Sequence, residues 1–212
     1  MISRSTMIAS QLRGRGIRSL AVLDAFAAIP REAFVDPELQ HHAYADRPLP
    51  IGYGQTISQP YVVALTAELL ALHGTDRVLE IGTGSGYAAA ILGRLARRVD
   101  TIERIPELAE RARETLASLG IRNVFVHCAD GSLGWIDNAP YDGIAVAAYA
   151  PAPPPSLRAQ LAVGGRLVMP VGPDRRQRLV KIVREIDDVF DERKLTPVAF
   201  VPLVGAEGWP AP

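Results

Sequence analysis

The sequence predicts an α/β protein with a doubly wound, mostly parallel β-sheet. Two observations support this prediction. From Arg77 onward, short apolar runs alternate with segments of helical periodicity, and a dense group of glycines separates the first run from the first helix. Strands and helices that alternate at this spacing form parallel strands joined by right-handed crossovers.

The N-terminal part of the chain predicts helices and loops. Residues 4–28 carry apolar side chains at helical spacing and predict two helices divided by Gly14-Arg15-Gly16. Residues 30–59 are rich in proline and glycine and predict a loop. A further helix is expected to begin near Pro60, because proline is tolerated in a first helical turn. Its inward residues should be Val63, Leu65, Leu69 and Leu70.

Six apolar runs predict the strands of the sheet: Val78–Ile81, Val99–Ile102, Val124–Val126, Gly143–Ala147, Arg166–Met169 and Leu179–Val183. Helices are expected between the first three runs, at Tyr87–Leu95 and Glu107–Leu119. A last run at Val198–Val201 follows Leu179–Val183 without a helix, so we expect an antiparallel closing strand. The prolines of Pro151–Pro155 predict a rigid loop.

Size and composition limit the function classes. We expect 212 residues to form one structural domain, with an N-terminal helical and loop segment at 1–60 packed on a core at 61–212. Lysine plus arginine and aspartate plus glutamate number 23 each, which argues against a nucleic-acid partner. The uncharged run Gly143–Leu157 contains four prolines and is too short for a membrane span. A single cysteine and an N-terminus without an apolar signal favour the cytoplasm, and we expect a monomer.

The most informative motif is the glycine loop after the first strand. Gly82, Gly84 and Gly86 allow a tight turn and a close approach of the backbone to a ligand. A dinucleotide motif would place its third glycine where Tyr87 stands. The acid Glu80 would repel a phosphate and suits a cation such as an amino-acid ammonium group.

Two more acids follow predicted strands. Glu103 stands where a doubly wound fold places the carboxylate that binds ribose hydroxyls, and Asp130 follows the next strand, directly before Gly131. The carboxyl ends of parallel strands meet at one edge of the sheet, so these groups could share a cleft with the glycine loop. A nucleoside with an amino-acid tail, as in S-adenosylmethionine, fits them better than NAD. The four histidines are adjacent or isolated in the sequence, which argues against a metal site.

Several motifs carry a family resemblance. Glu80–Tyr87, Ile102–Arg104, Asp130-Gly131 and Gly164–Val168 are similar to class I methyltransferases. The segment Arg47–Pro60, with its Gly-Gln-Thr-Ile-Ser-Gln-Pro sequence, resembles protein-L-isoaspartate O-methyltransferases more specifically. Gln11–Ile17 and Phe200–Leu203 are also similar to that family, so the resemblance covers roughly residues 7–205.

The resemblance implies a Rossmann-like, mostly parallel seven-stranded sheet. It implies transfer of a methyl group from S-adenosyl-L-methionine to the α-carboxylate of L-isoaspartyl residues in damaged proteins and peptides. The resulting ester collapses to a succinimide, part of which reopens to normal aspartate. No nucleic acid, membrane or metal enters this reaction.

The resemblance also implies site residues. Ser58 matches the active-site serine, and Thr56 and Ile57 would line the methyl-transfer cleft. The methionine part of the cofactor would be held by the glycine loop with its acid, namely Glu80, Gly82, Thr83, Gly84, Ser85 and Gly86. Its ribose and adenine would be held by Glu103, Arg104, Asp130 and Gly131. The acceptor would be bound by Ser58, Ala148 and Tyr149.

This chemistry requires no general base, because a carboxylate with a pKa near ~4 is already ionised at neutral pH. Ser58 would then orient one oxygen of the acceptor carboxylate by a hydrogen bond. A purely structural role as the cap of the helix at Pro60 is the alternative.

Other functions stay open at this point. Tyr149 stands where the family usually has a small residue, and it could narrow the acceptor pocket or point outward. A narrowed pocket would suit another carboxylate, on a biosynthetic peptide or a small acid. A cofactor-binding paralogue without activity is a further alternative, and a nucleic-acid methyltransferase is a weaker one, since Ala147–Pro151 lacks a base-flipping motif.

Overall fold

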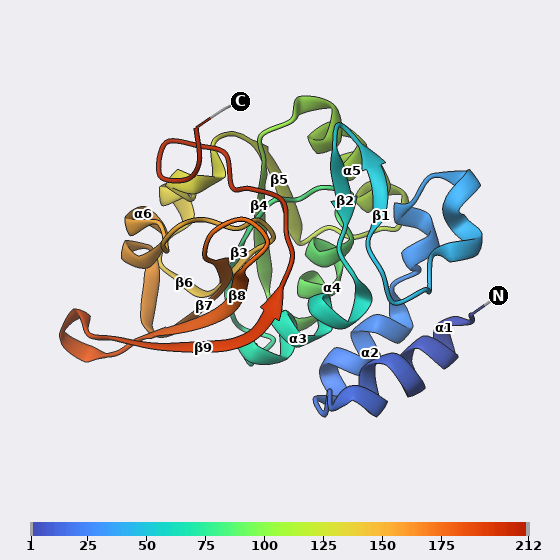
Figure 1. Cartoon of the computed structure of the whole chain (residues 1–212), viewed down its shortest axis with the longest axis horizontal. Coiled ribbons are helices and arrows are strands. Elements are labelled where there is room, and N and C mark those ends of the chain that lie inside the picture. The colour runs from blue at the N-terminus through green and yellow to red at the C-terminus, as the bar shows by residue number, and fades with distance from the viewer. Residues whose placement is uncertain (1, 211–212) are drawn as a thin grey trace.

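The computed structural model describes residues 2–210 and contains one seven-stranded sheet in the order β5-β4-β3-β6-β7-β8-β9 (Figure 1). Strands β3 to β7 pair in parallel, and β8 and β9 close the sheet in antiparallel register. The mostly parallel fold predicted from the strand–helix alternation is therefore confirmed. The strands span Arg77–Ile81 (β3), Arg98–Glu103 (β4), Val124–Cys128 (β5), Tyr141–Val146 (β6), Leu161–Val171 (β7), Gln177–Arg184 (β8) and Phe190–Val198 (β9).

The central strands are buried on both faces, as expected of a parallel sheet covered on two sides. In β3, Val78 packs into the cluster that includes α3 and α4, while Leu79 and Ile81 pack into a second cluster on the other face. The first cluster is built from helices α2 (Leu20–Ala28), α3 (Pro60–Leu70), α4 (Tyr87–Leu95) and α5 (Pro106–Ser118). The second contains the short helix α6 (Pro155–Ala159) and the C-terminal Leu203.

The closing strand lies earlier than the sequence predicts. We expected it at Val198–Val201, but β9 ends at Val198. Its sequence is mostly polar and half-exposed, because it is the edge of the sheet, so it shows no apolar run. The apolar residues that follow instead cross the carboxyl ends of the strands, where the carbonyl of Val201 accepts a hydrogen bond from the N–H of Tyr149 at 2.8 Å.

Two elements formed in segments expected to be loops. A hairpin of β1 (Leu49–Gly52) and β2 (Gln55–Ile57) stands within residues 30–59. Its strands are too short, and too interrupted by Pro50 and Gly52, to show alternation. The proline-rich segment begins α6 at Pro155, since proline fits the first turn of a helix.

The N-terminal residues form helical turns before α2: α1 (Arg4–Thr6), a π-helical turn (Met7–Leu12) and a 3-10 turn (Arg13–Arg15). The break predicted at the glycine pair is present, with Gly16 in the left-handed region at a φ of 99°. Two further 3-10 turns follow α2, at Arg31–Phe34 and Pro37–His42.

The N-terminal segment packs directly on the helix that carries the glycine loop (Figure 1). The rings of Phe26 and Phe34 lie edge-on to Tyr87, at centroid distances of 5.9 and 5.5 Å. Arg31 is fully buried beside them, with its guanidinium carbon 4.8 Å from the centroid of the Tyr87 ring. Within residues 2–210, no helix has both the length and the apolar character needed to cross a bilayer.

Candidate active site

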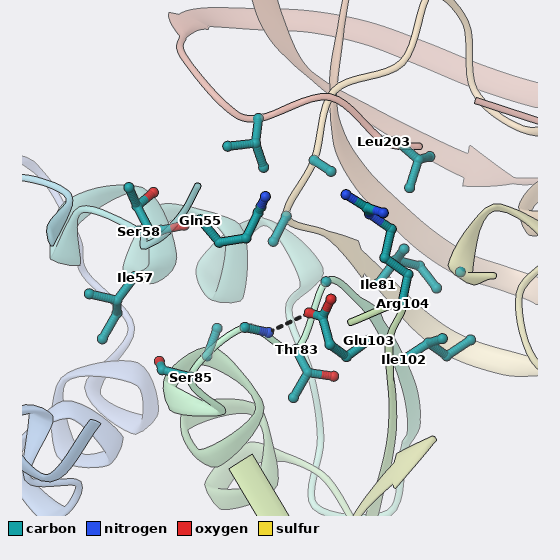
Figure 2. Close-up of a pocket in the computed structure, with 18 of the residues that line it drawn as sticks. Gln55, Ile57, Ser58, Ile81, Thr83, Ser85, Ile102, Glu103, Arg104 and Leu203 are labelled. Atoms are coloured by element: carbon teal, nitrogen blue, oxygen red, sulfur yellow. Dashed lines mark hydrogen bonds between the residues drawn. The ribbon is translucent and has the colours of Figure 1, made fainter. Parts of the chain in front are cut away.

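A cleft of about 770 Å³ opens at the carboxyl ends of β3, β4 and β6. Figure 2 shows Ser58 and Gln55 on one side of it and Glu103 and Arg104 on the other. Most residues that the resemblance implied line this cleft: Thr56, Ile57, Ser58, Gly82, Thr83, Gly84, Ser85, Glu103, Arg104, Gly131 and Ala148. The topology thus brings together residues from five separate segments of the chain.

The glycine loop follows β3 in a conformation that favours glycine. Gly82 and Gly84 have φ values of 91° and 53°. A Cβ on Gly82 would lie 3.4 Å from the Cβ of Ala147, and one on Gly84 would lie 3.3 Å from Cδ1 of Ile51. The loop therefore presents bare backbone to the cleft, where a ligand can approach closely. Gly86, by contrast, begins α4 and packs on Ala112 outside the cleft.

Glu103 ends β4 and is held by two backbone donors. Its Oε2 accepts a hydrogen bond from the N–H of Gly84 at 2.9 Å, and its Oε1 accepts one from the N–H of Ile105 at 3.0 Å (Figure 2 shows the first). Only 6% of its surface is exposed. The carboxylate is therefore fixed in the wall of the cleft, and its remaining lone pairs can accept hydrogen bonds from ligand hydroxyls.

Ser58 precedes α3 and has no hydrogen-bond partner for its hydroxyl among the residues that the structure describes. The N-cap of α3 is Gln59, which makes no side-chain cap bond, so the structure shows no capping by Ser58. Ser58 lines the cleft and two neighbouring cavities, a largely apolar one of about 420 Å³ and an outer groove of about 1290 Å³. Its free hydroxyl thus stands where three cavities meet.

Glu80 does not line the cleft but the apolar cavity behind it. Thr101 donates a hydrogen bond to its Oε2 at 2.6 Å, and the Oγ1 atoms of Thr101 and Thr83 lie 2.7 Å apart. Burial raises the pKa of Glu80 to about 8, with a smaller contribution from the nearby charge of Glu103; the Thr101 hydrogen bond opposes this rise. Glu80 is therefore mainly protonated at neutral pH in this structure.

Asp130 also lies outside the cleft, although Gly131 lines it. Its Oδ1 accepts hydrogen bonds from the N–H and hydroxyl of Ser132 at 2.9 and 2.7 Å, and its Oδ2 accepts one from the N–H of Ala206 at 2.7 Å. Partial burial alone would raise the pKa of Asp130, but these donors outweigh it and hold the pKa below its usual value. Asp130 ties the C-terminal segment across this side of the site.

Tyr149 points away from the cleft. It is 8% exposed, and its ring packs edge-on to Trp209 at a centroid distance of 5.7 Å. Its neighbour Ala148 lines the cleft instead. Of the two orientations left open by the sequence, the structure has the one directed away from the cleft, so Tyr149 does not narrow the cleft.

Sequence reasoning assigned no site role to several lining residues. Gln55 reaches the cleft from the unexpected hairpin, and Ala147 from the end of β6. The C-terminal residues Val201–Val204 cover the cleft as they cross the sheet edge. The segment Phe200–Leu203 did carry a family signal, but its position over the cleft depends on contacts with Tyr149 that only the fold reveals.

Comparisons with known proteins agree with this geometry. The model of the family described as protein-L-isoaspartate(D-aspartate) O-methyltransferase matches residues 3–208. The chain is 56% identical over 208 residues to protein-L-isoaspartate O-methyltransferase 2 of Marinobacter nauticus, covering 98% of this chain and 95% of that protein. It is 57% identical to protein-L-isoaspartate O-methyltransferase 1 of Rhodopseudomonas palustris, covering 97% of this chain and 84% of that protein.

Solved structures are similar over nearly the whole chain. A protein-L-isoaspartate O-methyltransferase superimposes with a TM-score of 0.87 at 30% identity, covering 97% of this chain and 67% of that one. A Plasmodium falciparum structure in complex with S-adenosyl-L-homocysteine has a TM-score of 0.82 at 24% identity, covering 95% of this chain and 97% of that one. At 24% identity, the similarity to the Plasmodium falciparum structure supports the fold alone.

Proposed function

The chain belongs to the protein-L-isoaspartate(D-aspartate) O-methyltransferase family, and we propose that its methyl transfer takes place where the cleft meets the outer groove at Ser58. The protein is an S-adenosylmethionine-dependent methyltransferase that acts on the α-carboxylate of L-isoaspartyl residues in damaged proteins. The observation that supports this location is the Ser58 hydroxyl, which has no hydrogen-bond partner within residues 2–210 and belongs to a residue that lines both cavities.

The cleft fits S-adenosylmethionine. Gly82 and Gly84 line it without side chains, and Glu103 offers a fixed carboxylate to ribose hydroxyls. We assign Thr56, Ile57, Thr83, Ser85, Arg104 and Gly131 to the same binding surface, because they line the cleft. We place Glu80, Gly86 and Asp130 behind this surface, where they support it. When bound, the cofactor supplies an electrophilic methyl group on its sulfonium.

On the acceptor side, the reaction depends on orienting the acceptor carboxylate more than on acid–base chemistry. The acceptor carboxylate is ionised at neutral pH, so no residue has to remove a proton. The Ser58 hydroxyl can donate one hydrogen bond to a carboxylate oxygen and turn the other oxygen toward the cleft. Ala147 and Ala148 present only small side chains there, and Val201 and Leu203 line the cleft with apolar side chains. Alignment of this kind is a large source of rate enhancement.

Damaged proteins and peptides with L-isoaspartyl residues are the acceptors. We further propose that the enzyme works as a monomer in the cytoplasm without nucleic acid or membrane. A zero formal net charge and a single, exposed cysteine support this. Size-exclusion chromatography and cell fractionation test these two points.

A substrate panel tests the function. Labelled methyl transfer is measured on an isoaspartyl peptide, on its aspartyl twin and on a small dicarboxylic acid. We expect label on the isoaspartyl peptide alone, followed by a succinimide product detected by mass spectrometry. Label on the aspartyl peptide or the small acid, without label on the isoaspartyl peptide, would show that the acceptor is another carboxylate. Cofactor binding without any transfer would show a non-catalytic protein.

A further inference from the structure

The outer groove contains one charged side chain that the proposed methyl transfer does not use. The groove runs from Ser58 and Thr56, between the N-terminal segment and residues 196–201, and Arg15 lines it. Among the described residues that line this groove, Arg15 is the only charged one. It is contributed by the turn before Gly16, far in sequence from the cofactor loop.

Arg15 is held in place from two directions. Its guanidinium carbon lies 3.5 Å from the centroid of the Tyr61 ring, and its NH1 donates a hydrogen bond to Oδ2 of Asp46 at 2.5 Å. Stacking on an aromatic face and pairing with a carboxylate both restrict the guanidinium plane. Arg15 therefore loses less rotamer freedom on binding a further group than an unrestrained arginine side chain would.

The Arg15–Asp46 pair presents its positive end outward. Asp46 also accepts hydrogen bonds from Nε2 of Gln59 at 2.8 Å and from the N–H of Tyr61 at 3.2 Å, and its side chain is 20% exposed. The Arg15 side chain is 44% exposed. Within residues 2–210, Nε and NH2 of Arg15 have no hydrogen-bond acceptor, so guanidinium donors remain free on a residue that lines the groove.

We propose that Arg15 is a specificity residue that binds a carboxylate of the acceptor polypeptide, outside the reacting group. This carboxylate is an aspartate or glutamate side chain near the isoaspartyl residue, or the C-terminal carboxylate of a short acceptor. The inference rests on the proposed function, because it takes the groove at Ser58 as the acceptor site. An Arg–carboxylate pair gives geometric selection, while neutral acceptors still enter the groove.

The test compares acceptor peptides within one enzyme. Isoaspartyl peptides carry a single glutamate one or two residues before or after the isoaspartate, each with a matched glutamine peptide. Every peptide is made with a free and with an amidated C-terminus, which separates the two sources of the carboxylate. The measured quantity is kcat/KM for the glutamate peptide divided by that for the glutamine peptide, or for the free acid divided by the amide. If only part of a variant folds, this ratio does not change, because the fraction of active enzyme affects both kcat/KM values equally.

We expect the wild type to prefer the extra carboxylate by about two- to five-fold in at least one position, as for a partly exposed ion pair. Arg15→Gln should bring the ratio to about one, and Arg15→Lys should retain part of the preference. Arg175→Gln is the matched control, since Arg175 is exposed and lies outside the groove. The wild-type preference should shrink as salt is raised from about 0.05 to about 0.5 M, where charges are screened.

The inference is overturned if the wild type shows no preference at any position, or if Arg15→Gln keeps the wild-type ratio. A preference that does not respond to salt would also contradict it. Turnover of the neutral glutamine peptide reports separately on the proposed function. A wild type that turns over isoaspartyl peptides without any carboxylate preference therefore contradicts the role of Arg15 alone, whereas absence of turnover on all isoaspartyl peptides contradicts the proposed function.

Discussion

The backbone N–H of Gly84 donates a hydrogen bond to Oε2 of Glu103, at 2.9 Å. This bond joins the glycine loop after β3 to the end of the neighbouring strand β4, in the wall of the cleft. The same carboxylate accepts a second bond from Ile105. Glu103 is therefore both a part of the cleft wall and the group that holds the loop in place.

Glu103→Gln should weaken cofactor binding. The amide loses the charge and can place an N–H donor opposite the N–H of Gly84 or Ile105. Hydrogen bonds to charged groups contribute about 1.5–3 kcal/mol, which corresponds to an increase in the Kd for S-adenosylmethionine of about ten- to a hundred-fold. Isothermal titration calorimetry measures this Kd. Glu114→Gln, at an exposed position on α5, is the control and should bind like the wild type. An unchanged Kd in Glu103→Gln would remove Glu103 from the binding site.

Asp130→Asn should destabilise the fold in a manner that depends on pH. The hydrogen bonds from Ser132 and Ala206 outweigh burial and lower the folded-state pKa of Asp130 below its ordinary value. A carboxyl with a lowered folded-state pKa stabilises the fold above its unfolded-state pKa of about 3.9, and the stabilisation is lost as pH falls through the folded-state pKa. The urea midpoint of the variant should therefore lie below that of the wild type at pH 7 and pH 5, and the difference should shrink below about pH 4.

Asp137→Asn is the control for this experiment, because Asp137 is exposed in the same part of the chain. It should unfold like the wild type at all pH values. A difference between Asp130→Asn and the wild type that grows as the solution is acidified would contradict the assignment of the lowered pKa to Asp130.

Glu80→Gln should show the opposite dependence on pH. Burial raises the folded-state pKa of Glu80 to about 8, against an unfolded-state value of about 4.3. Between these values the folded wild type retains a proton that the unfolded chain has released, so its stability falls as pH rises. Glutamine does not titrate, and its oxygen can still accept the Thr101 hydrogen bond.

The melting temperature of Glu80→Gln should therefore rise relative to that of the wild type from about pH 4 to about pH 8 and level off above it. Differential scanning calorimetry at several pH values measures the difference. If the difference is the same at pH 5 and pH 8, Glu80 titrates normally, and the account of its burial is wrong.

Gly131→Ala should destabilise the fold because there is no room for a methyl group at position 131. A Cβ there would lie 2.5 Å from Cγ2 of Ile81, inside the second apolar cluster. Overpacking of this kind costs about 1–3 kcal/mol, which denaturant unfolding can measure. Gly74→Ala is the matched control, because nothing lies within 4 Å of its Cβ position. Equal stability of the two variants would show that Ile81 yields without cost.

Local patterns predicted the central sheet, because buried parallel strands are apolar runs and the glycine loop is a continuous motif. The hairpin β1–β2 could not be predicted in this way, since strands of four and three residues are too short for their alternation of buried and exposed residues to be recognised. The position of β9 was missed because Phe190–Val198 is an edge strand with a polar sequence. In each case the element is defined by pairing with the neighbouring strand of a hairpin, which a short or polar sequence does not reveal.

The residues of the candidate site also fall into two groups, those that local patterns placed correctly and those that they did not. Residues within motifs, such as Gly84 and Glu103, were placed in the cleft by their position at strand ends. Asp130 is also at a strand end, but its partner Ala206 lies 76 residues along the chain, and no local pattern reveals that contact. The outward orientation of Tyr149 depends in the same way on Trp209.

The most direct test of the site is the turnover of Ser58→Ala on an isoaspartyl peptide, measured together with its Kd for S-adenosylmethionine. The Ser58 hydroxyl is proposed to orient the acceptor, so kcat/KM should fall by about ten-fold or more, as for the loss of a hydrogen bond to a charged group. The Kd for the cofactor should change less than two-fold, and Ser118→Ala, on the exposed end of α5, should behave like the wild type. Wild-type turnover in Ser58→Ala would contradict the placement of the transfer at Ser58.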